Sequence, residues 1–147
     1  MKKTFLLIIG MVLLTLISMA QEYKVVTIVE SIVPMGLGRS RLIENTSEIS
    51  AADLTTERTD GKNSNQKDVK RGNVKVDSFK ETKLLNFYSA VGINFQNIAS
   101  NDAVIASKIN ELTAKGWKLT YVTSAVESDA GKSDGNGIFI TRLFFTK

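Results

Sequence analysis

The part of the chain that most constrains its fold is an amphipathic segment that ends at Gly116. Glycine is the usual residue where a helix ends in the left-handed conformation, and Trp117 directly after it can fold back on Leu112, as in a Schellman motif. Ser100 predicts the N-cap of this helix, with Asp102 in the first turn beside the positive end of the helix dipole. Between these ends, apolar residues recur at spacings of three and four, as on one buried helix face. They are Val104, Ile105, Ile109 and Leu112.

Two strands are expected after this helix and one before it. Residues 117–126 alternate in polarity and residues 138–145 are apolar on both faces, which is typical of a hairpin whose second strand is central in a sheet. Residues 23–33 are rich in β-branched side chains and contain no glycine or proline, so they predict the first strand. One face of this strand carries Tyr23, Val25, Thr27 and Val29, and the other carries Lys24, Val26, Ile28 and Glu30.

The middle of the chain is less regular. Residues 39–43 predict a short second strand after a turn that begins at Pro34. Residues 84–91 predict a further strand, with a short helix as the alternative, because the periodicity does not separate the two. Residues 59–73 contain a single apolar side chain, Val69, and cannot offset their ordering entropy by burial.

These elements predict a single α+β domain over residues 21–147. We expect a small antiparallel sheet of three to four strands with one main helix packed on one face. A long polar and mobile insertion is expected at about residues 44–80.

The first twenty residues are typical of a secretory signal peptide. Lys2 and Lys3 precede an apolar run, and small residues at Ser18 and Ala20 form a cleavage site before Gln21. A retained membrane anchor is the alternative, but residues 5–20 are short of the roughly 20 needed to span a bilayer. We therefore expect a bacterial protein exported to the periplasm, the cell surface or the medium, with no membrane span after cleavage.

The chain of 147 residues contains neither cysteine nor histidine. This excludes disulfides, a thiolate nucleophile, a Ser-His-Asp triad and imidazole metal ligands. Cleavage would lower the formal charge from +4 to +2, because Lys2 and Lys3 leave. The basic residues form no cluster of the kind that binds nucleic acid, so we expect no nucleic-acid partner.

Oxygen ligands do occur together in the polar loop of residues 127–137. Glu127, Asp129, Asp134 and Asn136 lack the spacing of an EF-hand, and turn formation explains the loop better. We therefore predict no metal, cofactor or catalytic residues.

A glycine turn after the first strand is a candidate anion contact, formed by Gly36, Gly38, Arg39 and Arg41. Backbone N–H groups in such a turn can cradle an anion, and arginine adds bidentate contacts. The segment lacks the further glycine and the Lys-Ser pair of a phosphate-binding loop, so a plain hairpin turn is the favoured interpretation.

Two other arrangements in the sequence bear on function. Ser107 and Lys108 are neighbours on the predicted helix and do not face each other, as a Ser/Lys nucleophile would require. Several aromatic side chains are candidates for a binding platform, although at these spacings we expect most of them in the core. They are Phe87, Tyr88, Phe95, Trp117 and Tyr121.

Three short motifs carry a resemblance to a known family. The first strand begins Tyr23-Lys24-Val25-Val26, the helix ends Leu112-Thr113-Ala114-Lys115-Gly116-Trp117-Lys118-Leu119, and the chain ends Phe144-Phe145-Thr146-Lys147. In these motifs the chain resembles a widespread family of small bacterial domains of unknown function. The resemblance implies an α+β fold and carries over no catalytic residues. The export signal and the insertion between about residues 35 and 98 depart from that family's pattern.

These observations together favour a non-enzymatic exported module of the cell envelope that binds an envelope protein or a small ligand. A hydrolase using carboxylates or Ser/Lys is one alternative. A structural or oligomer-forming envelope component, in which an open sheet edge pairs with another chain, is the other.

Overall fold

The computed structural model describes residues 21–32, 40–127 and 137–147. The predicted signal peptide lies outside these residues, as does most of the polar loop after residue 127. Within the described ranges, no helix is both long enough and apolar enough to cross a membrane.

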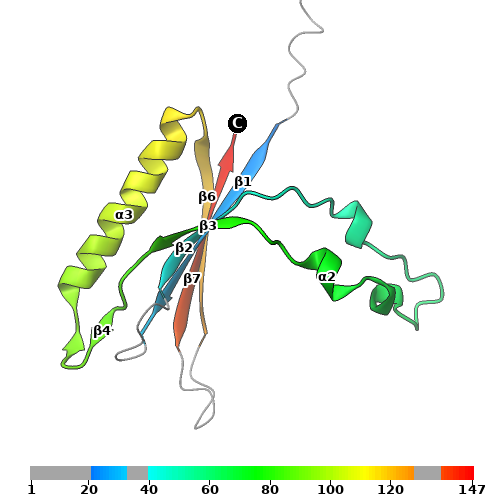
Figure 1. Ribbon diagram of the computed structural model, residues 1–147, viewed down its shortest axis with the longest axis horizontal. Helices are drawn as coiled ribbons and strands as arrows, with labels where there is room; N and C mark the ends of the chain where they lie inside the picture. The colour runs from blue at the N-terminus through cyan, green and yellow to red at the C-terminus, as the bar shows by residue number, and fades with distance from the viewer. Residues whose placement is uncertain (1–20, 33–39, 128–136) are drawn as a thin grey trace, which may run out of the picture.

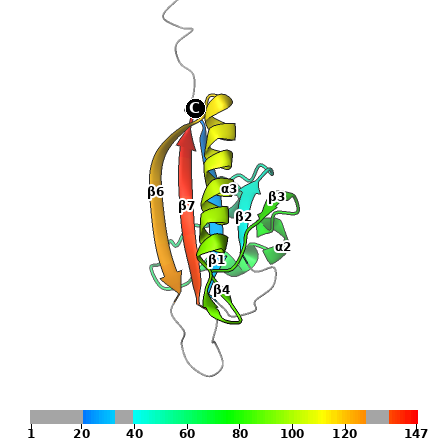
Figure 2. The ribbon, with the colours of Figure 1, turned by 90° about the vertical axis from the view of Figure 1, so that its left-hand side faces the viewer.

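One antiparallel sheet and one long helix form the body of the domain (Figure 1). The sheet has five strands in the order β3-β2-β1-β7-β6. The helix α3, Phe95–Ala114, lies along one face of it (Figure 2). The predicted α+β fold is therefore present, with five strands in the main sheet where three to four were expected. The strands are β1 Tyr23–Ser31, β2 Arg41–Asn45, β3 Phe79–Lys83, β6 Lys118–Glu127 and β7 Ile138–Thr146.

The strand β1 lies between β2 and β7, and β6 and β7 form the predicted hairpin. Val26 and Ile28 of β1 are buried and point towards α3, as their alternation predicts. The predicted apolar side of the helix packs on the same core, which confirms the helix face read from the sequence. The buried core residues are Val26, Ile28, Leu42, Leu84, Leu112, Trp117, Leu143 and Phe145.

The end of α3 is the Schellman motif that the sequence predicts. Gly116 adopts a φ of 87°, in the left-handed region. The Trp117 N–H donates to the carbonyl of Leu112 (3.1 Å), and the Gly116 N–H donates to that of Thr113 (2.9 Å). Trp117 is only 8% exposed and shares the core with Leu112, so the motif fixes the angle at which the chain enters β6.

Gly116→Ala is expected to destabilise the domain by about 1 kcal/mol, because a side chain in the left-handed region is strained. The new Cβ would meet only the end of the flexible Lys147 side chain, at 3.5 Å, so backbone strain is the main cost. Urea unfolding measures it. Gly72→Ala is the control, since this helical glycine has open space around it and no positive φ, and its variant should unfold at or above the wild-type midpoint. Equal stability of the two variants would contradict the role of Gly116.

The N-cap of the helix lies six residues earlier than predicted. Asn94, not Ser100, is the N-cap, and its side chain accepts a hydrogen bond from the Asn97 N–H (3.1 Å). Ser100 lies within the helix, where its hydroxyl donates to the carbonyl of Gln96 (2.8 Å). The predicted cap at Ser100, and with it Asp102 in the first turn, is therefore wrong, because Asn94 offers an earlier cap.

The predicted strand at residues 84–91 is also wrong. The fifth strand is β3, Phe79–Lys83, which pairs with β2. Within residues 84–91 only β4, Tyr88–Ser89, is extended, and it pairs with β5, Gly92–Ile93, in a separate two-stranded hairpin. The backbone of Leu85 bonds to the side chain of Asn101 rather than to a strand, which explains the interruption.

Residues 46–78 connect β2 to β3 and form what we call the arm. The arm leaves the sheet on the side opposite α3 (Figure 1) and contains three short helices without buried residues. At its base, the hydroxyls of Thr46 and Ser47 both donate to the carbonyl of Ser78, at 3.1 and 2.9 Å. The arm falls within the predicted insertion, and its mobility stays a prediction. The short helices are η1 Ala52–Leu54, η2 Asn65–Asp68 and α2 Arg71–Val74.

Candidate functional site

The face of the sheet turned away from α3 carries aromatic and branched side chains. Because Val26 and Ile28 point towards α3, the alternate side chains of β1 point the other way. The register extends this set across neighbouring strands, since Val25 lies opposite Phe144 and Phe144 opposite Tyr121. We call this surface the open face. Its large apolar members are Tyr23, Val25, Val29, Ile43, Phe79, Tyr121, Ile138, Ile140 and Phe144.

The open face is in contact with solvent. Tyr23 is 67% exposed, Tyr121 62% and Val25 39%. The rings of Tyr121 and Phe144 lie with centroids 5.8 Å apart in a tilted arrangement, which gives the surface an aromatic pair. A contiguous apolar surface that meets water usually marks an interaction site.

Arg142 lies within the open face. Its neighbours across the ladder are Thr27 on β1 and Thr123 on β6, so it is flanked by uncharged side chains. The residue is exposed, and no carboxylate in the described part of the chain lies within ion-pair distance of it. An apolar surface with one unmatched guanidinium suits a ligand that combines apolar groups with a carboxylate.

A cavity of about 410 Å³ opens beside the same face. Residues 22–25, at the start of β1, form one wall, and residues 45–48, at the base of the arm, form the other. The arm thus borders the open face at its β2 side, close to Tyr23 and Val25.

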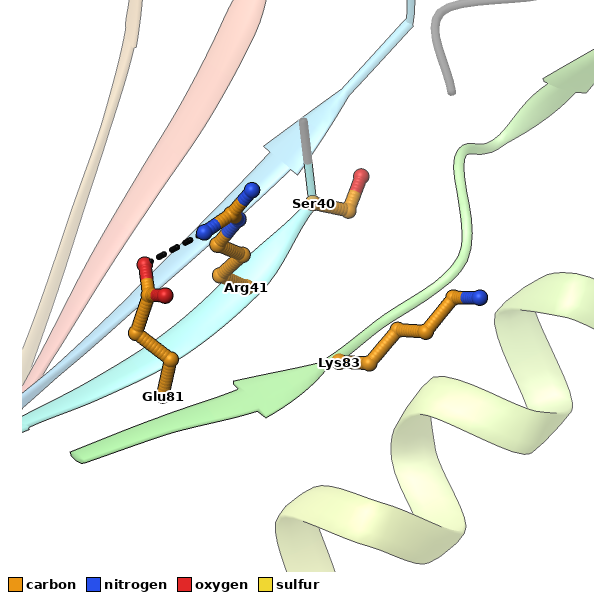
Figure 3. A pocket seen from close by; sticks show the side chains of 4 residues that line it. All are labelled: Ser40, Arg41, Glu81 and Lys83. Atoms are coloured by element: carbon orange, nitrogen blue, oxygen red, sulfur yellow. Dashed lines mark hydrogen bonds and ion pairs between the residues drawn. The ribbon is translucent and has the colours of Figure 1, made fainter. Parts of the chain in front are cut away.

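The predicted anion contact is only partly within the described residues. Gly36, Gly38 and Arg39 lie outside them. Arg41 lines a cavity of about 260 Å³ together with Ser40, Glu81 and Lys83. Figure 3 shows its guanidinium paired with Glu81, at 2.6 Å between Nη1 and Oε1, while the Lys83 side chain extends away from this pair. Because Glu81 already supplies a carboxylate to Arg41, an anion would have to compete with it, and the contact stays a prediction.

The structure does not bring the candidate aromatic residues together. Trp117 is buried on the α3 side of the sheet, whereas Tyr121 lies on the open face. Phe87 packs against Phe139 with centroids 5.7 Å apart, and Phe95 is 76% exposed at the start of α3. The exposed aromatic surface instead combines Tyr121 with Tyr23 and Phe144. Alternation along β1 and β6 was the sequence signal for it, but alternation alone does not show which face a helix covers.

The strongest charge cluster lies on the α3 side of the sheet and centres on Glu44. Its carboxylate accepts hydrogen bonds from Lys24 (3.1 Å) and Lys108 (3.4 Å). Burial alone would raise the pKa of Glu44, but the bonds and charges of these two lysines outweigh it and hold that pKa below its usual value. The Lys24 ammonium also lies 5.3 Å from the centre of the Trp117 ring. The cluster ties α3 to β1 and β2 and is structural.

Lys108 does not have the lowered pKa that a Ser/Lys nucleophile requires. Its hydrogen bond to Glu111 (2.6 Å) is the main cause of a raised pKa, to which Glu44 adds. A lysine that acts as a general base needs a lowered pKa. Ser107 next to it is exposed on the helix surface.

A second polar group of contacts is centred on Asn101, which is 1% exposed in the second turn of α3. Its amide accepts from the Leu85 N–H (2.8 Å), donates to the Leu85 carbonyl (2.8 Å) and donates to Glu30 (2.9 Å). Burial raises the pKa of Glu30, partly offset by the bond from Asn101, and the negative charge of Asp102 raises it further. Asn101 thus fixes the loop before β4 to both the helix and the sheet.

Within the described residues, no group of three or more acidic side chains is arranged to hold a metal ion. The fold and its exposed surface define a small α+β domain with one covered and one open sheet face. No protein-family model matches the chain, and no curated protein or solved structure matches it either.

Proposed function

We propose that the chain is a non-enzymatic interaction module of the cell envelope, exported by its signal peptide, and that it binds a protein partner through the open face. The observation that carries the proposal is the solvent exposure of Tyr23 and Tyr121 on a sheet face opposite the only long helix described. Aromatic side chains of this kind contribute most of the binding energy at many protein interfaces. The resemblance to small bacterial domains of unknown function belongs to the same proposal.

The chemistry of the open face specifies the partner. Tyr23, Val25 and Phe144 offer an apolar centre, and Arg142 offers a guanidinium without an internal carboxylate among the described residues. The partner therefore presents an apolar surface with a carboxylate that pairs with Arg142. A small ligand would fit the cavity beside the arm, but a protein partner accounts for the whole length of exposed surface.

A capture experiment tests this proposal. The tagged protein, purified after export, is incubated with envelope extract beside a double variant, Tyr23→Ser with Tyr121→Ser. Because both tyrosines are more than half exposed, the double variant should fold normally and lose the captured partner at least tenfold. Circular dichroism and thermal unfolding verify the fold of each variant.

Phe95→Ser is the matched control. Phe95 is an aromatic residue of similar exposure, 76%, but it belongs to α3 on the other side of the sheet. The control should capture the partner as well as the wild-type protein does. Equal capture by all three proteins, or loss with Phe95→Ser alone, would contradict binding through the open face.

The alternative of a hydrolase would predict turnover of a substrate by the purified protein. No observation on the described residues favours it over binding, and the raised pKa of Lys108 counts against its Ser/Lys form. The other alternative, an oligomer-forming component, is favoured by the outer edge of β6, which pairs with no other strand in the described part of the chain.

A further inference from the structure

The outer edge of the sheet at β6 is long and unpaired. β6 spans ten residues, Lys118–Glu127, and in the described part of the chain it pairs with β7 alone. Its interior carries no charge and no proline, the two devices that usually protect an edge strand from pairing with another chain. Val122 is 46% exposed and Val126 56%, although both lie on the α3 side of the sheet. Figure 2 shows why: α3 lies over the middle of the sheet, and β7 lies between it and β6 in this view, so β6 stays uncovered.

The ladder alternation indicates which backbone groups of β6 point outward. Glu22 and Lys147 exchange two backbone hydrogen bonds, at 3.1 and 3.0 Å. From this pair, every second residue of β7 bonds to β1, and the residues between them, Arg142 included, bond to β6. Thr123 lies opposite Arg142, so it directs its N–H and C=O towards β7. Val122, Ser124 and Val126 therefore direct theirs outward, where they can bond to another strand.

The geometry points to a second copy of this chain as the occupant of this edge, paired antiparallel about a two-fold axis at Thr123. In this register Val122 lies opposite Ser124 of the second copy. The irregularity between Leu119 and Tyr121 then shifts the pairing by one residue. The shift places Lys118 opposite Glu127 of the second copy, so the two charges of the strand are matched at both ends.

This self-complementarity selects a second copy over an unrelated strand. The axis is perpendicular to the sheet and leaves both helices on one side, with the two open faces continuous on the other. On the helix side, Leu119 meets Val126 of the second copy, which removes exposed apolar surface from water. The result is one sheet of ten strands, twice the number in a single chain. The inference does not depend on the proposed function.

Equilibrium sedimentation of the protein purified after export tests the inference directly. The expected result at tens-of-micromolar protein is twice the monomer mass. A monomer mass at that concentration would overturn the inference. A missing envelope partner with a dimeric mass would instead contradict only the proposed function.

Two substitutions at Ser124 separate edge pairing from stability. Ser124→Pro removes an N–H that points away from β7, so it should yield a monomer while the β6–β7 ladder is kept. Both substitutions remove the hydrogen bond between the hydroxyls of Ser124 and Thr141 (2.8 Å). Ser124→Ala keeps the backbone N–H, however, so this variant should stay dimeric. A dimeric Ser124→Pro protein, or a monomeric Ser124→Ala protein, would overturn the inference.

The absence of cysteine from the chain allows a disulfide test that does not depend on the proline variant. In the proposed register Thr123 faces its own copy in a pair with Cα atoms about 4.5 Å apart, within the range of a disulfide. Thr123→Cys should therefore form a covalent dimer under mild oxidation. Ala125→Cys, on the same face of β6, would place its two copies about 13 Å apart along the strands and should not. Equal cross-linking of the two variants, or none in either, would overturn the register.

Discussion

Asn101→Ala is expected to lower the free energy of unfolding by about 3 kcal/mol. The substitution leaves the N–H and C=O of Leu85 without the partner that the Asn101 amide supplies, and it removes the bond to Glu30. A buried backbone group left unpaired costs about 1–3 kcal/mol, and the groups of Leu85, which is partly exposed, fall at the lower end of this range. Urea unfolding at neutral pH measures the change.

The neighbouring Ser100→Ala is the control for this prediction. Ser100 is exposed and bonds only within α3, to the carbonyl of Gln96, so its variant should stay within about 0.5 kcal/mol of the wild-type protein. Asn101→Asp adds a second readout, since it places a new carboxylate against Glu30. Its destabilisation should be larger at neutral pH, where both groups are ionised, than in acid. Equal stability of the Asn101→Ala and Ser100→Ala proteins would disprove the role assigned to Asn101.

Glu44→Gln is expected to cost about 1–2 kcal/mol at neutral pH. The substitution leaves Lys24 without a matching charge and leaves Lys108 paired with Glu111 alone. The expected cost stays below that of a fully buried pair, because a quarter of the Lys24 side chain remains exposed and solvent screens its charge. Thermal and urea unfolding across a pH series measure it.

The pH dependence of this effect follows from the lowered pKa of Glu44. A carboxyl group with a lowered folded-state pKa stabilises the protein above its unfolded value, near 4.5, and loses that contribution as the pH falls through the folded value. The difference between the wild-type and Glu44→Gln proteins should therefore shrink in acid.

Glu30 is the matched contrast, because its pKa is raised rather than lowered. Its ionised form is disfavoured in the folded state, so stability falls as the pH rises from about 4.5 through the raised value. Glu30→Gln keeps an oxygen that can accept from Asn101 and removes this cost. Its stability at neutral pH should equal or exceed that of the wild-type protein. Loss of stability in Glu30→Gln comparable to that in Glu44→Gln would show that the two environments have been assigned wrongly.

The elements with strong local signals could be predicted from the sequence. The end of α3 combines a glycine that adopts positive φ with a tryptophan that reaches the core, and both signals lie within a few residues. The β6–β7 hairpin could be predicted for a similar reason, since apolar residues on both faces of β7 require a central strand.

The elements that depend on distant partners could not be predicted. β3 has one large apolar residue, Phe79, and is a strand because β2 supplies its hydrogen bonds. Leu84 and Leu85 resemble the start of a strand. The side chain of Asn101, sixteen residues further along the chain, instead forms hydrogen bonds with the N–H and C=O of Leu85. A polar residue within a helix gives no sequence signal for such a contact.

The same reasoning applies to the candidate surface. The alternation on β1 predicts that Tyr23 and Val25 share a face, which the burial of Val26 and Ile28 on the other face confirms. Which of the two faces the helix covers depends on how α3 packs, and that follows from the assembled core rather than from β1 alone.

Site-specific photo-cross-linking in cells that produce the full chain tests most directly whether the open face is where it acts. A photoreactive phenylalanine derivative is introduced in place of Tyr23, and in a second protein in place of Phe95, an aromatic residue of similar exposure in α3. We predict a discrete adduct with a partner protein from position 23 and none from position 95. An adduct from position 95 alone, or no adduct from either position, would contradict the account.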